Sequence, residues 1–187
     1  MMGEAKRMQQ LVDDLISLSR IEADRFSVPQ ATLALGPVID EVVGVIRSGL
    51  QDGGGRIVVD AGPVPQIRAD RVQIGQLLHN LIGNAIKYGR PDTPIRVSLK
   101  DVGDKVRLRV LDQGEGVPPE HLPRLTERFY RVDPGRSRSV GGTGLGLAIV
   151  KHIAERHRAT LDIASRVGEG TAVTVTFPAA QPDTLSS

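Results

Sequence analysis

The sequence predicts an α/β two-layer sandwich: a mixed, mainly antiparallel sheet with helices on one face, preceded by a helical stalk. Two patterns predict this fold class. Apolar and polar residues alternate in two pairs of short segments, each pair joined by a four-residue turn, as in half-buried antiparallel strands. Before and between these pairs, apolar residues recur at spacings of three and four, as in helices that cover one face of a sheet.

Composition limits the kind of protein. The chain has 187 residues, of which 40% are hydrophobic and 25% charged, as expected for one globular domain with an appendage. The 24 basic residues nearly balance the 22 acidic ones, so we expect no nucleic-acid partner. The absence of Cys excludes disulfides, thiolate metal sites and cysteine nucleophiles. No apolar run is as long as a membrane span and no signal peptide is recognisable, so a cytoplasmic location is expected.

Residues 4–26 are predicted to form one helix, which ends before Pro29. Its apolar residues recur mostly three and four apart and cover more than one side of the helix: Met8, Leu11, Val12, Leu15, Ile16, Leu18 and Ile21. Because no second helix follows closely to cover them, we interpret the segment as half of a helical hairpin or bundle whose other half is missing or comes from a second chain. The alternative is a helix docked on its own domain.

Between residues 31 and 70 the sequence predicts only short elements. Gly and Pro residues bound them, and Asp70 is of the residue type that favours a helix N-cap. In order, these elements are a strand at Leu33 and Leu35, a helix from Gly36 to about Leu50 that the glycines at 53–55 end, and strands over 56–60 and 66–68.

The stretch from Gln73 to Tyr88 is predicted to be a helix with two unlike faces. One face is apolar and suits packing on a sheet: Ile74, Leu78, Leu81, Ile82 and Ala85. The other is rich in amides and ends in a cation: Gln73, Gln76, Asn80, Asn84 and Lys87. On this stretch alone, two interpretations stay open. The polar face is an ordinary solvated surface, or it is a row of oxygen ligands, then a cation and an aromatic ring, arranged for a metal-bound phosphate ligand.

After Gly89 the alternating pattern of strands dominates. In order, the predicted elements are strands over 95–99 and 106–110, a short helix within 118–128, a mobile polar loop over 133–142, a helix over 144–157, strands over 160–165 and 171–177, and a disordered tail over 181–187.

Two glycine-containing motifs carry further chemistry. Asp112 leaves a predicted strand and is followed by Gly114 and Gly116. An ionised Asp is an acceptor only and can receive an amino group such as that of adenine, while glycines let a flat ring approach the backbone, although turns also use these residues. The second motif, residues 141–147, leads directly into a helix, where converging backbone N–H groups favour an anion. A loop that merely packs closely on its helix is the alternative.

Four motifs then occur in a specific order: Asn80-x-x-x-Asn84-x-x-Lys87-Tyr88, Asp112-x-Gly114-x-Gly116, Arg128-Phe129-Tyr130-Arg131, and Gly142-Thr143-Gly144-Leu145-Gly146-Leu147. They resemble the N, G1, F and G2 boxes of the ATP-binding catalytic domain of bacterial sensor histidine kinases, in the superfamily shared with gyrase, Hsp90 and MutL-type mismatch-repair ATPases. The resemblance implies that residues 31–180 form this domain and that residues 1–27 are the second helix of the dimerisation and phosphoacceptor hairpin.

The resemblance also implies a role for each site residue. The cofactors are ATP and Mg²⁺, with Asn84 as the metal ligand, and Asn80, Lys87 and Arg131 are the catalytic residues. A lid is implied over residues 117–141, anchored by Phe129. The complete set of implied cofactor-binding residues is Asn80, Asn84, Lys87, Tyr88, Asp112, Gly114, Gly116, Phe129, Arg131, Gly142, Thr143, Gly144, Leu145, Gly146, Leu147 and Thr171.

The implied function is transfer of the γ-phosphoryl group of Mg-ATP to a histidine of the hairpin, in two-component signal transduction. The implied partners are ATP and ADP, that hairpin, a response regulator receiver domain and, in the full-length inner-membrane sensor, a second copy of the protein. None of the four histidines is followed by an acidic residue, as a phosphoacceptor histidine of this family is: His79, His121, His152 and His157. We therefore expect no autophosphorylation of this chain.

Other functions of the same superfamily remain as alternatives: an ATPase or molecular clamp, a degenerate module that only binds nucleotide, and a serine kinase of the anti-sigma type. The clamps carry a Glu general base where Asn80 stands, and an amide cannot take a proton from water. The chain also departs from the histidine kinase pattern at Thr126, where Phe is usual, and at Arg158-Ala159, where Gly is usual. A residue other than Gly at a left-handed C-cap costs about 1 kcal/mol.

Overall fold

The computed structural model describes residues 2–52, 54, 56–135 and 140–182. Its main sheet has five strands, and the first two of them in space are parallel while all other pairs are antiparallel. This confirms the mixed, mainly antiparallel sheet. In spatial order the strands are β2 (Ile57–Ala61), β4 (Ile95–Asp101), β5 (Lys105–Asp112), β7 (Gly170–Pro178) and β6 (Thr160–Arg166).

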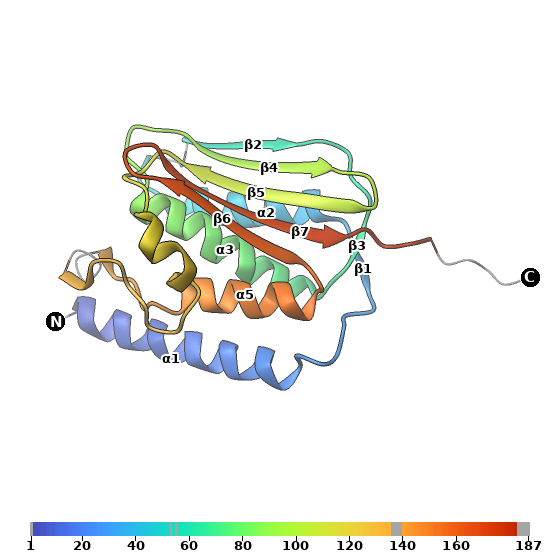
Figure 1. Ribbon diagram of the computed structural model, residues 1–187, viewed down its shortest axis with the longest axis horizontal. Helices are drawn as coiled ribbons and strands as arrows, with labels where there is room; N and C mark the ends of the chain where they lie inside the picture. Colours follow the sequence, from blue (N-terminus) through green and yellow to red (C-terminus); the bar gives the residue numbers. More distant parts are fainter. Residues whose placement is uncertain (1, 53, 55, 136–139, 183–187) are drawn as a thin grey trace, which may run out of the picture.

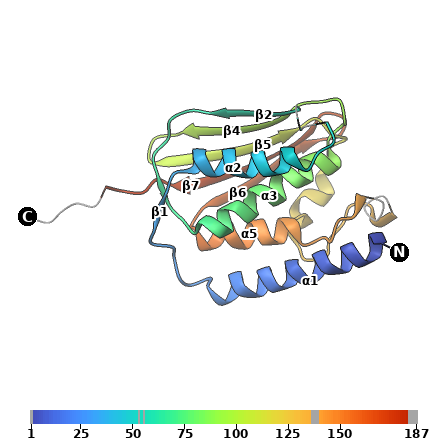
Figure 2. The same cartoon turned by 180° about the vertical axis from the view of Figure 1, so that it is seen from behind.

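Three helices cover one face of this sheet: α2 (Leu35–Ser48), α3 (Arg71–Tyr88) and α5 (Gly146–Arg156) (Figures 1 and 2). The burial of alternate residues along β5 follows from its sequence, because Val106, Leu108 and Val110 point to the helices while the arginines between them stay exposed. The apolar stripe of α3 is buried as predicted, and Asp70 caps this helix by accepting from the N–H groups of Val72 and Gln73. The two-layer sandwich is confirmed.

The N-terminal helix α1 (Met2–Ala23) does not project as a stalk but lies along α5, on the side of α5 away from the sheet (Figure 1). Leu18 and Ile21 are buried in this contact. Apolar residues on the rest of its surface are exposed: Met2, Met8, Val12, Leu15 and Ile16. The side of α1 that faces α5 fits the interpretation of a helix docked on its own domain. The other side is apolar and is not covered by any described residue, as expected for half of a hairpin or bundle.

Several elements differ from the prediction. Leu35 begins α2 instead of ending a strand, and the short strand β1 (Thr32–Leu33) pairs with β3 (Ile67–Arg68) in a separate two-stranded sheet. Gln73, predicted on the polar face, is buried, because α2 and α5 both pack on α3. The short helix after Val117 is a 3-10 helix, η1 (Pro119–Arg124).

Some predictions fall partly outside the described residues: the glycines at 53 and 55, part of the loop at 133–142, and most of the tail at 181–187. Within the described part of the chain, no helix is both long enough and apolar enough to cross a membrane.

Candidate functional site

A cavity of about 890 Å³ opens between α3, the beginning of α5, the ends of β5 and β7, and α1. Most of the residues implied by the four motifs meet at its wall, although they come from segments far apart in the sequence. Those that line it are Asn80, Asn84, Lys87, Tyr88, Asp112, Gly116, Arg131, Gly142, Thr143, Gly144, Gly146, Leu147 and Thr171. Gly114, Phe129 and Leu145 are not part of the lining, and Leu145 belongs to the core.

The polar face of α3 forms one wall. Asn80, Asn84 and Lys87 lie about one turn apart on the helix, so their side chains share one face. The amide nitrogen of Asn80 lies 3.4 Å from the carbonyl oxygen of Gly146, to which it donates. A Cβ on Gly146 would lie 4.0 Å from Oδ1 of Asn84. The two amides therefore face the first turn of α5, where backbone N–H groups lack helical partners and attract anions.

Asp112 lies at the opposite end of the cavity, where β5 leaves the sheet. Its side chain is 9% exposed, and Oδ1 accepts a hydrogen bond of 2.9 Å from the N–H of Gly114. Burial raises the pKa of Asp112 above its ordinary value, although the N–H groups of Gly114 and Thr171 and the charge of Arg56 act in the opposite direction. A buried acceptor at a cavity wall is suited to bind a donor group of a ligand.

The glycines after Asp112 are also required by the packing of the protein's own backbone. A Cβ on Gly114 would lie 2.2 Å from the carbonyl oxygen of Tyr88, and a Cβ on Gly116 would lie 2.0 Å from that of Arg166. Gly116 also has a φ of +74°. Both glycines are therefore required where two segments of the protein's own backbone cross, and Gly114 forms a bridge to Gly89 that joins this motif to the end of α3.

The glycine loop before α5 is held by backbone contacts with the Arg128–Arg131 motif. The N–H of Phe129 donates to the carbonyl oxygen of Gly144 at 2.9 Å, and a Cβ on Gly144 would lie 2.9 Å from the Cα of Phe129. Gly144 has a φ of +78° and Phe129 a φ of +63°. The Phe129 side chain is 55% exposed, so its backbone rather than its ring holds the loop.

Arg131 places a cation at the cavity wall, beside the glycine loop. Its Nη2 atom is buried and has no hydrogen-bond partner within the described part of the chain. A Cβ on Gly142 would lie 3.3 Å from this atom and 3.2 Å from the hydroxyl oxygen of Tyr88, so the glycine leaves space between the two side chains. A buried guanidinium nitrogen is normally hydrogen-bonded, so one without a partner beside a glycine loop points to an anionic ligand. Arg128, in contrast, forms an ion pair with Glu22.

The sequence analysis missed that α1 contributes to the cavity. Lys6, Arg7, Gln10 and Asp14 line it, and Asp14 is 6% exposed. The hydroxyl of Thr143 donates to Oδ2 of Asp14 at 2.7 Å. A signal was present in the sequence, because Asp14 interrupts the apolar positions of its helix at the spacing that places it on the buried side, with Leu18 and Ile21.

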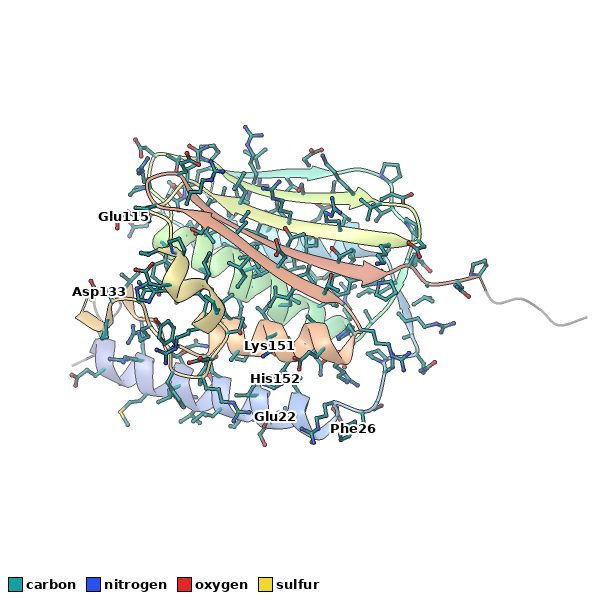
Figure 3. All side chains as sticks on the ribbon, viewed as in Figure 1. Glu22, Phe26, Glu115, Asp133, Lys151 and His152 are labelled. Atoms are coloured by element: carbon teal, nitrogen blue, oxygen red, sulfur yellow. The ribbon has the colours of Figure 1, made fainter. Side chains whose placement is uncertain are left out.

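Further along α1, Glu22 lies across from His152 of α5 (Figure 3), with 3.8 Å between Oε1 and Nε2. Burial lowers the pKa of His152, while Glu155 acts in the opposite direction. Because Glu22 also pairs with Arg128, this part of α1 contacts both α5 and the segment that holds the glycine loop.

Residues 69–181 match the family described as histidine kinase-, DNA gyrase B- and HSP90-like ATPase. The chain belongs to this family. It is 41% identical over 185 residues to the phosphate regulon sensor protein PhoR of Pseudomonas aeruginosa, covering 97% of this chain and 41% of PhoR. It is 32% identical over 177 residues to the sensor protein SrrB of Staphylococcus aureus, covering 95% of this chain and 30% of SrrB. The chain thus spans less than half the length of these curated relatives.

Solved structures agree with this membership. The mycobacterial sensor histidine kinase MprB superposes with a TM-score of 0.67 at 27% identity, over 81% of this chain and 99% of that chain. Full-length ShkA in complex with AMPPNP superposes with a TM-score of 0.77 at 25% identity, over 96% of this chain and 38% of that chain. The chain is therefore an ATP-binding domain of the histidine kinase type found in two-component sensor kinases, as the four motifs predicted.

Proposed function

We propose that this domain binds Mg-ATP in the cavity between α3 and α5 and transfers its γ-phosphoryl group to a histidine of a dimerisation hairpin whose second helix is α1. The observation that carries the proposal is the buried, unpartnered Nη2 of Arg131 beside Gly142 at the wall of the cavity. A triphosphate at this end would supply the missing acceptor, and Asp112 at the other end would receive the amino group of adenine.

The donor set fits magnesium. No group of three or more His, Cys, Asp or Glu residues that could hold a metal occurs in the described ranges, so a cation here depends on few protein ligands. Mg²⁺ prefers oxygen ligands, keeps several waters and is commonly held by one or two side chains together with phosphates. Oδ1 of Asn84 would be its protein ligand, and the bound ion would neutralise phosphate charge during transfer.

The remaining residues position and neutralise the ligand. Lys87 and Arg131 would place positive charge beside the phosphates, where it stabilises the transition state of phosphoryl transfer. The glycine loop would offer backbone N–H groups, and Tyr88 would lie against the adenine side. Asn80 is held by Gly146 and has no basic group, so it orients the phosphate end and does not activate water. We therefore expect slow intrinsic hydrolysis, unlike that of an ATPase clamp.

The exposed apolar side of α1 supports the assignment of residues 1–27 to the hairpin. Met8, Val12, Leu15 and Ile16 would pack on the first helix of the hairpin and on the second copy in a dimer. The receiver domain of a response regulator would then accept the phosphoryl group from the histidine. In the full-length protein we place this domain on the cytoplasmic side of a membrane-anchored sensor.

The test of nucleotide binding is calorimetry with Mg-ATP on the chain and on Asn84→Ala. We expect the variant to bind Mg-ATP at least about tenfold more weakly, because a hydrogen-bonding or ligating group to a charged partner contributes about 1.5–3 kcal/mol. Gln76→Ala is the matched control, since Gln76 lies on the same helix but outside the cavity lining. Equal Mg-ATP affinity of Asn84→Ala and the parent would refute the site.

The test of phosphoryl transfer mixes the chain with Mg-ATP and a separate hairpin that carries the phosphoacceptor histidine, and then measures phosphohistidine. We expect transfer to the hairpin and none to this chain. A chain that binds Mg-ATP but labels no hairpin histidine would favour the nucleotide-binding-only module.

A further inference from the structure

Three polar residues lie side by side at the end of the cavity that Asp112 closes. Thr171 of β7 is the register partner of Asp112 on β5 and of Ser165 on β6. Directly opposed residues of neighbouring strands point to the same face of a sheet, so the three side chains form a row. Asp112 and Thr171 line the cavity, whereas Ser165 lies one strand further and is not part of the lining.

Ser165 is the centre of a small hydrogen-bond network. Its hydroxyl oxygen lies 2.8 Å from the backbone nitrogen of Val117, 2.8 Å from the carbonyl oxygen of Gly170 and 2.8 Å from the hydroxyl oxygen of Thr171. The N–H of Val117 only donates and the carbonyl of Gly170 only accepts. These two partners therefore fix one lone pair and the single proton of the Ser165 hydroxyl.

These two hydrogen bonds of Ser165 decide the direction of the third one. Since the Ser165 proton is given to Gly170, the remaining lone pair of Ser165 receives the proton of the Thr171 hydroxyl. The oxygen of Thr171 then presents only lone pairs to the cavity. Asp112 beside it is also an acceptor, held by the N–H of Gly114. The side chains of Asp112 and Thr171 therefore both present acceptors to this end of the cavity.

We propose that Ser165 is a positioning residue for base specificity. It turns the proton of the Thr171 hydroxyl away from the cavity, so that this wall selects a base with an amino group over a base with a carbonyl group at the same place. The inference rests on the proposed nucleotide function and names the specificity of that site. Adenine presents two amino protons to the two acceptors. Hypoxanthine and guanine would place the lone pairs of a carbonyl oxygen against the same acceptors, which leaves buried polar groups unpaired.

The experiment compares the dissociation constants of Mg-ATP and Mg-ITP, whose bases differ at this amino or carbonyl position. For the parent chain we expect ATP to bind about 100-fold more tightly than ITP, because the carbonyl of ITP would leave a buried acceptor without its partner. In Ser165→Ala the Thr171 hydroxyl is free to donate into the cavity, so the preference should fall about tenfold, the equivalent of one hydrogen bond. Ser165→Thr keeps the hydroxyl and should keep the preference.

Three further variants separate positioning from general structural damage. Thr171→Val removes the hydroxyl, and in that background Ser165→Ala should cause no further change in the ATP to ITP ratio. Ser165→Cys keeps most of the side-chain volume but is a weak hydrogen-bonding group, so it should lower the ratio if Ser165→Ala does not fold. Ser98→Ala on β4, outside the cavity lining, should leave the ratio unchanged.

The outcomes are distinguishable. A parent chain that binds neither nucleotide overturns the proposed function together with this inference. A parent chain that prefers ATP while folded Ser165→Ala or Ser165→Cys keeps the full preference overturns the inference alone. A loss of preference that also occurs in the Thr171→Val background overturns it as well, because Ser165 would then act by a route other than the Thr171 hydroxyl.

Discussion

The two ends of α5 differ in how their polar groups are satisfied. At the C-terminal end, Arg156 is 8% exposed and donates from Nε to the carbonyl oxygens of Asp24 and Ser27 and from Nη1 to Asp70. His157 is 3% exposed, with Nδ1 2.7 Å from the carbonyl oxygen of Ile153 and Nε2 accepting from the N–H of Asp70 at 3.0 Å. The polar side chains at this end of α5 are therefore hydrogen-bonded to other groups of the protein.

At the N-terminal end the helix meets the cavity through the glycine loop. Arg131 beside it has a buried Nη2 atom without a partner in the described part of the chain, and Thr143 is held by Asp14 of another helix. One helix is thus anchored at one end, and in the proposed function it meets the ligand at the other. The comparison implies that substitutions at the C-terminal end change the free energy of unfolding, whereas substitutions at the N-terminal end change nucleotide affinity.

The largest effect is expected for Arg156→Ala. It leaves Asp70 and two carbonyl oxygens without the Arg156 guanidinium, so the free energy of unfolding should fall by about 2–3 kcal/mol, measured by urea denaturation. Mg-ATP affinity of the folded variant should stay within about twofold. Lys151→Ala, on an exposed site of the same helix, is the control and should change stability by less than about 0.5 kcal/mol. A large loss of affinity at unchanged stability would contradict the comparison.

The second effect is a pH dependence of the free energy of unfolding that His157 causes. Burial lowers the pKa of His157, and the N–H of Asp70 blocks protonation of Nε2. Above about pH 6.5 the histidine is neutral in both the folded and the unfolded state, and its contribution to stability is fully present. As pH falls below that value the unfolded state binds a proton that the folded state does not, so stability should decline by up to about 1.4 kcal/mol per pH unit.

Urea denaturation between pH 5 and 8 measures this slope, and His157→Gln should reduce it. Asp70 acts in a separate window: burial would raise its pKa, but the N–H of Gln73 and the charge of Arg156 outweigh burial, so its pKa lies below 3.8. Its stabilising charge is therefore lost only in stronger acid. An unchanged slope in His157→Gln would assign the pH dependence to another group, such as His152.

The third effect lies at the other end of α5. Asp14 holds the hydroxyl of Thr143 and lines the same cavity, so its negative charge competes with a phosphate group. Asp14→Asn should raise Mg-ATP affinity by about three- to tenfold while adenosine affinity stays constant, at a cost of about 1 kcal/mol in stability. Asp13→Asn, the exposed neighbour that accepts from Gln9, is the matched control. Tighter binding of adenosine as well would show that charge is not the cause.

The smallest effect is a gain. Arg158 follows α5 with a φ of +54°, which confirms that a residue other than Gly occupies the left-handed position after this helix. Arg158→Gly should stabilise the chain by about 0.5–1 kcal/mol, seen as a rise of about 2–4 °C in Tm, without a change in Mg-ATP affinity. Lys151→Gly within the helix should have the opposite sign. A loss of stability in Arg158→Gly would mean that the arginine side chain makes a contact worth more than the strain.

The sequence by itself determined the elements of the fold and the order of the motifs. Alternation predicted β4 and β5, the helical period predicted the buried stripe of α3, and Asp70 was recognised as its cap. These features depend on residues within a few positions of one another, so local propensity is enough to predict them. The motifs from Asn80 to Leu147 identified the family because their chemistry recurs in a fixed order.

Only the tertiary structure decided which parts of the chain share the cavity and why. Gln73 is buried because neighbouring helices pack on α3, and Gly114 and Gly116 are required by crossing backbone segments. Asp14 reaches Thr143, 129 positions away in the sequence, and Ser165 fixes the hydroxyl of Thr171 through strand register. Such contacts form between segments that packing brings together, so no local pattern of residues specifies them.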